Sequence, residues 1–133
     1  MMIKAIFFDI DGTLLSFKTH CVSPSTVDAM AQLRKKGIKL FIATGRTLCE
    51  INNLDDLTFD GYITMNGAYC VNPKYEVIHQ DLIPREDIEA LIRYLEENEQ
   101  FPCMLMTPEK NIANYLGEPI LELTRWSICP CPK

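Results

Sequence analysis

The chain has 133 residues, the length of one ordinary domain, and its 47% apolar and 23% charged residues exclude a disordered chain. Eighteen acidic against thirteen basic residues give a net charge of −5, which together with the lack of basic runs argues against a nucleic-acid or anionic-membrane partner. No apolar run is long enough to cross a bilayer, and acidic residues interrupt the first one, so we expect no membrane anchor or secretory signal. A cytoplasmic protein with reduced cysteines is the expectation.

Residues 3–8, IKAIFF, are β-branched and aromatic and predict a short buried strand. Two carboxylates, Asp9 and Asp11, follow this strand one residue apart, and Gly12 and Thr13 come next. A plain turn is the simplest interpretation of these residues. Two like charges on an extended backbone repel each other, however, which favours a bound cation between them, and Mg²⁺ is the cation that carboxylates and water hold.

A helix is predicted after this turn, because Ser23 is a suitable N-cap, Pro24 suits the first helical position and Gly37 suits the C-terminal end. Residues 38–43, IKLFIA, then predict a second buried strand. This strand leads directly into the tripeptide TGR at residues 44–46.

The TGR tripeptide has the chemistry of a phosphate site. The Thr44 hydroxyl and the backbone N–H groups of Gly45 and Arg46 can all donate to an anion just before a helix. Thr47 and Glu50 have the spacing of a capping box and predict that such a helix starts here. The alternative is a helix cap without a ligand.

The remaining elements follow from apolar patterns. Residues 61–65 predict a third strand that ends at Asn66-Gly67, and residues 68–80 predict a hairpin. Residues 85–99 predict an amphipathic helix. Two shorter elements are predicted beyond it, a strand at 103–106 and a helix at 118–125.

Strands and helices that alternate in this way predict an α/β fold with a doubly wound parallel sheet. In such sheets the working site lies at the carboxyl ends of the strands. Here the three strand ends carry DIDGT, TGR and NGA, which together predict a cradle for a small anion.

These motifs resemble those of a known family. FFDIDGTLL followed by IATGR, with Thr44 placed 33 residues after Asp11, resembles the haloacid dehalogenase (HAD) superfamily of phosphatases. YITMNGA at 62–68 resembles its Cof-type branch. The resemblance implies a Rossmann-like sheet, here incomplete: residues 1–80 as a partial core with a hairpin, and residues 81–133 as the beginning of an α+β cap domain.

The resemblance also implies a mechanism and a set of roles. Asp9 is the nucleophile and a Mg²⁺ ligand, and Asp11 is the general acid/base that also gives the metal its backbone carbonyl. The residues expected to hold the phosphate or line its pocket are Gly12, Thr44, Gly45, Arg46 and Asn66. The implied function is Mg²⁺-dependent hydrolysis of small phosphate monoesters, such as sugar phosphates, and the implied partner is a small phosphorylated metabolite.

Two later motifs of the family are not found, a charge-neutralising lysine and an acidic motif after a fourth core strand. The last aspartate of the chain is Asp87, and Gly117-Glu118 only imitates the acidic motif. The expectation is therefore a truncated enzyme whose first strand is an unpaired apolar edge, open to formation of a homo-oligomer. Two alternatives stay open: a catalytically incompetent chain that binds phosphate or metal or self-associates, and a sheet domain without a site.

Overall fold

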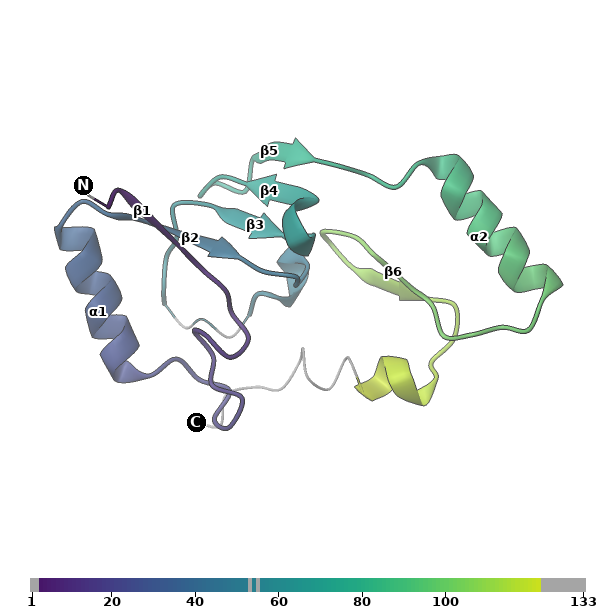
Figure 1. Cartoon of the computed structure of the whole chain (residues 1–133), viewed down its shortest axis with the longest axis horizontal. Coiled ribbons are helices and arrows are strands. Elements are labelled where there is room, and N and C mark those ends of the chain that lie inside the picture. Colours follow the sequence, from purple (N-terminus) through teal and green to yellow (C-terminus); the bar gives the residue numbers. More distant parts are fainter. Residues whose placement is uncertain (1–2, 53, 55, 123–133) are drawn as a thin grey trace.

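The computed structural model describes residues 3–52, 54 and 56–122, and its main feature is a five-stranded sheet in the order β1-β2-β3-β4-β5 (Figure 1). The strands are β1 (Ala5–Phe8), β2 (Lys39–Ala43), β3 (Tyr62–Thr64), β4 (Tyr69–Val71) and β5 (Val77–Gln80). The first three are parallel, and β3, β4 and β5 pair antiparallel. The predicted parallel sheet and hairpin are both confirmed, and together they form one mixed sheet.

Helix α1 (Pro24–Lys35) crosses from β1 to β2 and begins where the sequence predicts. The Ser23 hydroxyl accepts the Thr26 N–H at 3.2 Å, and Gly37 has a φ of +75°, the left-handed conformation that glycine adopts most easily. The core lies on one face of the sheet, where Leu40 and Ile42 of β2 are fully buried. Its other buried members are Ile10, Leu14, Leu15, Val22, Met30, Leu54 and Phe59.

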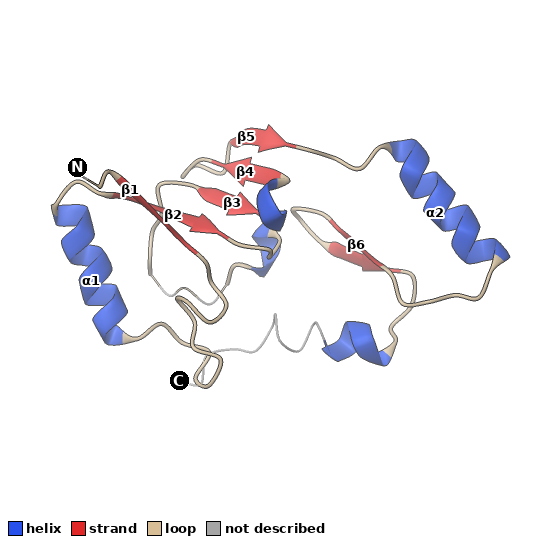
Figure 2. Cartoon of the chain, viewed as in Figure 1, coloured by secondary structure: helices blue, strands red, loops and turns tan. Residues whose placement is uncertain are grey.

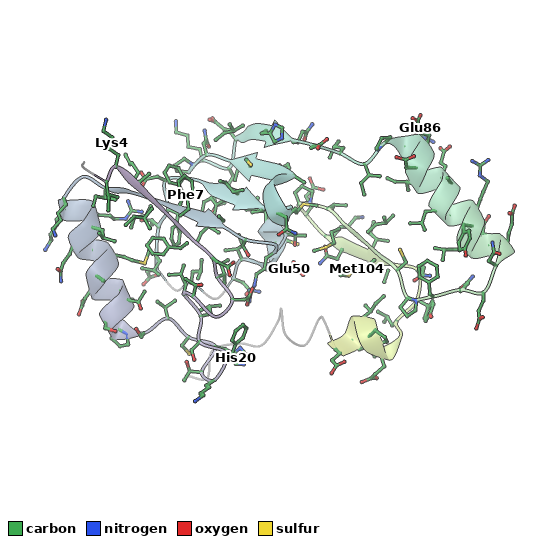
Figure 3. All side chains as sticks on the ribbon, viewed as in Figure 1. Lys4, Phe7, His20, Glu50, Glu86 and Met104 are labelled. Carbon is green, nitrogen blue, oxygen red and sulfur yellow. The ribbon has the colours of Figure 1, made fainter. Side chains whose placement is uncertain are left out.

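The opposite face of β1 and β2 is open among the described residues. Phe7, labelled in Figure 3, is 56% exposed and stacks on Phe41 with the ring centroids 4.9 Å apart. Within the described part of the chain β1 pairs only with β2, so the expected apolar sheet edge is present. The same geometry makes β1 less buried than its sequence predicts.

The predicted second helix is wrong in kind. Its capping box forms as expected, but the element is a single 3₁₀ turn, η1 (Leu48–Glu50). The backbone leaves helical geometry at Ile51, with φ −86° and ψ 86°, and Asn52 follows, a residue type that favours turns. One capped turn without continuing helical geometry gives no α-helix and therefore no helix dipole at this place.

Asp60 connects α1 to the sheet. Its carboxylate accepts the Leu40 N–H at 2.9 Å and the Lys39 ammonium at 2.9 Å, and it pairs with Arg34 at 3.4 Å. Burial acts to raise the pKa of Asp60, but these hydrogen bonds and positive charges outweigh it, so that the pKa lies below its ordinary value. The contacts fix the start of β2, and with it the direction in which this strand leads to its carboxyl end.

The second part of the chain is a separate small assembly, to the right of the five-stranded sheet (Figure 2). It contains α2 (Arg85–Glu97) and a two-stranded antiparallel sheet of β6 (Met104–Met106) and β7 (Asn111–Ala113). The sequence predicts α2 and β6 but misses β7, whose three residues alternate too briefly to give a strand pattern. Residues 118–122 are helical as predicted, and the rest of the predicted helix at 118–125 lies outside the described residues.

Two further expectations concern the cysteines and the membrane. Cys49, Cys70 and Cys103 carry free thiols as expected, whereas Cys21 is disulfide-bonded, contrary to expectation. Sequence neighbours do not tell which cysteines a fold brings together. In the described part of the chain no helix has the length and apolarity to cross a membrane.

Candidate active site

The carboxyl ends of β1, β2 and β3 meet at one edge of the sheet. Phe8 lies opposite Ile42, and Ala43 lies opposite Ile63, so the parallel strands end at nearly the same level. Asp9 directly follows Phe8, and Thr44 directly follows Ala43. The register therefore brings the three motifs that the sequence singles out to a common edge, as predicted for a parallel sheet.

A tight turn presents the carboxylates at the end of β1. The Ile10 carbonyl accepts the N–H groups of both Leu14 and Leu15, at 3.1 and 2.9 Å, while the Ile10 side chain is fully buried. Gly12 has a φ of +78°, and a Cβ there would lie 2.5 Å from the Phe17 ring, so no other residue fits this position without a shift. Asp9 is exposed, and no described residue donates a hydrogen bond to its carboxylate.

Thr44 joins the ends of β2 and β3. It is only 6% exposed; its N–H donates to the Ile63 carbonyl at 2.9 Å, and its own carbonyl accepts the Asn66 N–H at 3.2 Å. The Thr44 hydroxyl accepts the Arg46 N–H at 3.2 Å, so one of the three expected anion donors, the Arg46 N–H, is already engaged. The Gly45 N–H, in contrast, donates to no acceptor within the described residues.

Arg46 connects the loops that follow β1 and β2. Its Nε and terminal nitrogen donate to both carboxylate oxygens of Asp11, at 2.9 and 2.7 Å. The Arg46 side chain is 9% exposed and that of Asp11 is 45% exposed, so a nearly buried guanidinium holds a carboxylate that faces solvent. The other terminal nitrogen of Arg46 donates to the Glu50 carbonyl at 3.0 Å. This bidentate geometry fixes the orientation of the Asp11 carboxylate.

Asn66 lies next to Gly45 in a strained backbone. Met65 and Asn66 have φ values of 52° and 56°, in the left-handed region that non-glycine residues seldom enter. A Cβ at Gly45 would be 3.1 Å from the Asn66 side-chain oxygen, so the two residues approach as closely as a glycine allows. The predicted site residues thus form two connected pairs, Asp11 with Arg46 and Gly45 with Asn66.

Sequence reasoning missed part of the surrounding network. The Glu50 carboxylate accepts the N–H and the hydroxyl of Thr47 at 2.9 and 2.8 Å, and it also accepts the side-chain amide of Asn111 at 2.8 Å. The Cys49 N–H donates to the Pro108 carbonyl at 3.1 Å. Glu50, labelled in Figure 3, lies on the side of the sheet that faces the segment containing Met104. The capping box reveals half of this network, but nothing in the sequence pairs Glu50 with a residue 61 positions away.

The residues at this edge fit part of a Mg²⁺ shell. The Asp9 carboxylate is exposed, and within the described residues no N–H donates to the Asp11 backbone carbonyl, so two oxygen ligands are available. No group of three or more histidine, cysteine or acidic side chains that could hold a metal occurs within the described ranges. A cation bound here would complete its shell with water and phosphate oxygens, as Mg²⁺ commonly does.

Comparison with protein families identifies the fold. The model of the haloacid dehalogenase-like hydrolases matches residues 6–119, most of the chain. This chain belongs to that family. The Cof-type resemblance is confirmed as well, because the curated relatives of this HAD chain are phosphatases of that branch.

Two curated relatives of this HAD chain illustrate the match. The HMP-PP phosphatase of Shigella flexneri is 37% identical over 95 residues, which cover 70% of this chain and 34% of the relative. The putative phosphatase YkrA of Bacillus subtilis is 30% identical over 117 residues, which cover 87% and 44% of the two chains. This HAD chain therefore spans between about a third and a half of the length of these relatives.

Solved structures give the same result. The phosphatase BT1666 of Bacteroides thetaiotaomicron superposes with a TM-score of 0.80 at 37% identity, covering 92% of this chain and 46% of the other. The subclass IIB sugar phosphatase BT4131 superposes with a TM-score of 0.79 at 42% identity, covering 91% and 47%. The predicted incomplete Rossmann-like HAD fold is thereby confirmed.

Proposed function

We propose that this chain provides the phosphoryl-transfer site of a Mg²⁺-dependent phosphatase that acts on small phosphate monoesters, such as sugar phosphates. The observation that carries the proposal is the pair of carboxylates after β1. Asp9 is exposed and without a protein partner in the described part of the chain, while Asp11 is oriented by Arg46 beside Thr44 and Gly45. Membership of a family whose curated relatives are phosphatases supports it.

The proposed chemistry consists of two displacements at phosphorus. An Asp9 carboxylate oxygen attacks the phosphorus, the ester oxygen leaves with a proton from Asp11, and an aspartyl phosphate forms. Asp11 then takes a proton from water, which attacks the same phosphorus and releases inorganic phosphate and free Asp9. The Thr44 hydroxyl and the Gly45 N–H donate to the phosphoryl oxygens, with Gly12 and Asn66 at the border of their site. Bound Mg²⁺ would offset the negative charge on these oxygens.

Arg46 acts in this scheme as a positioning residue. Its guanidinium contacts both Asp11 oxygens and is itself held by the Glu50 carbonyl. A carboxylate that exchanges a proton twice must keep one orientation towards the leaving oxygen and then towards the water. The two hydrogen bonds from Arg46 supply that orientation.

The division of labour follows the two parts of the chain. We propose that residues 1–80 form the partial core that holds the phosphate and that residues 81–133 form the beginning of the cap. The five-stranded sheet ends at Gln80, and α2 with the β6–β7 hairpin comes after it. The same proposal includes Mg²⁺ as the cofactor, a small phosphorylated metabolite as the partner and the cytoplasm as the location.

The test is hydrolysis of p-nitrophenyl phosphate by the purified chain, with Mg²⁺ and with EDTA, beside the Asp9→Asn variant. Mg²⁺-dependent turnover that the variant loses is expected, because an amide cannot form the acyl phosphate. Turnover that persists in Asp9→Asn would remove Asp9 as the nucleophile. No turnover from a folded sample would favour the second candidate, a chain that binds phosphate or metal, or associates, without catalysis.

A specific observation favours association. The β1 edge has no partner within the described residues, and Phe7 on it is 56% exposed. Sedimentation velocity over a range of concentrations should show a homo-oligomer that Phe7→Lys weakens. Phe17→Lys is the matched control, because Phe17 is 62% exposed but lies outside the strand. A concentration-independent monomer would rule this association out.

A further inference from the structure

A cavity of about 520 Å³ lies between the phosphate end of the sheet and the second part of the chain. Gly45 and Asn66 line it from the sheet side, and Met104, Met106 and Ile112 line it from the β6–β7 hairpin. The volume falls within the range of about 300–1,000 Å³ that is typical of small-molecule sites. Since Gly45 and Asn66 also border the proposed phosphate site, a molecule whose phosphate binds at TGR would extend its leaving group into this cavity.

The cavity wall is mainly apolar. Leu82 and Ile83, from the segment between β5 and α2, line it although they are 66% and 62% exposed. Ile112 on the hairpin is 48% exposed and faces the same space. These side chains come from separate parts of the sequence but line one cavity, where they are exposed to water unless a ligand covers them.

Few polar side chains line the cavity. In the described wall they are Asn66, Tyr69, Asp81 and Thr107, of which only Asp81 is charged, and the Thr107 hydroxyl already donates to the Lys110 carbonyl. A polyhydroxylated group placed deep in this space would leave hydroxyls without partners, which is costly when they are buried. A ring or an alkyl group would instead cover exposed isoleucine, leucine and methionine.

We propose that this cavity selects phosphate esters with an aromatic or other apolar leaving group over esters of polyhydroxylated sugars. The inference rests on the proposed function, because it takes the phosphate to bind next to Gly45. It narrows the substrate class of the proposed function, in which sugar phosphates are included, to esters with an apolar group beside the phosphate, and it ranks sugar phosphates below them. Specificity then resides in the cavity wall, whereas recognition of the phosphate resides in the loops after β1 and β2.

The experiment measures binding rather than turnover, so that it does not depend on the chain being active. The whole chain with Mg²⁺ is titrated with phenylphosphonate, methylphosphonate and glucose 6-phosphate, and the dissociation constants are obtained by NMR or calorimetry. Burial of about 60 Å² of ring surface corresponds to about tenfold in affinity. Phenylphosphonate should therefore bind about tenfold more tightly than methylphosphonate, and more tightly than glucose 6-phosphate.

A pair of matched variants locates the effect. Ile83→Asn should reduce the preference for the phenyl compound to less than about threefold, because it replaces an apolar wall residue by an amide. Ile78→Asn should leave it unchanged, because Ile78 is similarly exposed, at 69%, but does not line the cavity. Both variants replace an exposed isoleucine by asparagine, so the comparison is independent of general surface polarity.

The outcomes separate the two proposals. Three results would overturn the apolar-leaving-group inference: equal affinity for phenyl- and methylphosphonate, tighter binding of glucose 6-phosphate, or equal effects of the two variants. In each case, binding of methylphosphonate would still support the phosphate site. Binding of phenylphosphonate that needs Ile83, without any binding of methylphosphonate, would refute the proposed phosphate site and leave the apolar cavity in place. Absence of binding by all three compounds would overturn both.

Discussion

The two parts of this chain use their apolar side chains in opposite ways. Of the twelve buried hydrophobic residues within the described ranges, ten lie before residue 81 and only Leu95 and Ile120 lie after it. Leu82, Ile83 and Ile92 of the second part are exposed instead. The part with most of the buried side chains therefore carries the proposed phosphate site, and the part with few of them forms the opposite wall of the cavity.

The difference suits the proposed function. Groups that take part in phosphoryl transfer need fixed positions, and the proposed ones follow strands whose inner face is buried. A segment with few buried contacts opens at little free-energy cost, as elements that admit and release ligands must. Within the described residues, the hydrogen bonds between the two parts include those of Glu50 with Asn111, of Cys49 with Pro108 and of Asp81 with Ala68.

The largest effect should come from a carboxylate in the packed part. Asp11→Asn should lower turnover by about 10²–10⁴-fold, because an amide cannot exchange the proton in either displacement. Binding of methylphosphonate should stay within about threefold of the original chain, since Asp9, Thr44 and Gly45 remain. Rapid-quench measurement of both half-reactions checks this prediction.

The control for this variant is Asp87→Asn, an exposed carboxylate in the first turn of α2. Its turnover should stay within about twofold of the original chain, because surface substitutions away from the site change little. Equal turnover of the Asp11 and Asp87 variants would refute the acid/base role of Asp11.

Truncation of a buried side chain to alanine should lower the free energy of unfolding more in the first part of the chain than in the second. Ile42→Ala removes a fully buried side chain from β2 and should lower the free energy of unfolding by about 3 kcal/mol. Leu95→Ala should cost less than about 2 kcal/mol, because few other buried side chains surround it and the segment can relax. Urea unfolding followed by circular dichroism measures both. Equal losses would mean that α2 belongs to the same cooperative core as β2.

Asp60→Asn should have a smaller, pH-dependent effect. At about pH 7 the loss of charge-assisted hydrogen bonds from Lys39 and Leu40 should cost about 1–2 kcal/mol. The pKa of Asp60 is lowered on folding from its ordinary value of 3.8, so the stabilisation is present above that value and is lost as the pH falls through the folded pKa. The difference in free energy of unfolding between the original chain and Asp60→Asn, measured by urea titration, should therefore become smaller as the pH falls below 3.8.

Asp28→Asn is the control for this pH dependence, because Asp28 is exposed on α1 and no ion pair involves it in the described part of the chain. It should change the free energy of unfolding by less than about 0.5 kcal/mol at any of these pH values. A gap between the original chain and Asp60→Asn that does not change with pH would contradict the role given to the Asp60 charge.

Local sequence signals predicted most of the elements and the common edge of the site. The strand runs, the Ser23 cap and the hairpin at residues 68–80 each depend on a few neighbouring residues, so they can be recognised in the sequence. The prediction of a second helix was wrong for the same reason, because a capping box predicts how a helix starts but not whether it continues after Ile51. β7 was missed because its stability comes from pairing with β6, not from its own pattern.

The site was predicted as a set of motifs but not as a network. The spacing of DIDGT and TGR places both at one sheet edge, yet the two hydrogen bonds from Arg46 to Asp11 depend on rotamers that no motif encodes. The tie between Glu50 and Asn111 joins positions 61 residues apart and lies beyond any local pattern. Long-range contacts of this kind are set by packing of whole elements, which the sequence of either partner alone does not reveal.

The smallest effect should arise at the contact between the two parts. Asn111→Ala removes the 2.8 Å hydrogen bond to Glu50, but it also removes a buried Oδ1 atom that has no hydrogen-bond partner in the described structure. The two effects oppose each other, so the free energy of unfolding should change by less than about 1 kcal/mol. The change should be seen instead as faster amide exchange in β6 and β7, by up to about fivefold.

Asn98→Ala provides the comparison for this last variant. Asn98 donates to the Tyr94 carbonyl at 2.9 Å, within the second part and without contact to the sheet, so its loss should leave exchange in β6 and β7 unchanged. If both variants accelerated exchange in the hairpin equally, the hairpin would be held by the second part alone. If only Asn111→Ala does so, the turn that carries Glu50, which also holds Arg46, is the point where motion of the loose part reaches the packed one.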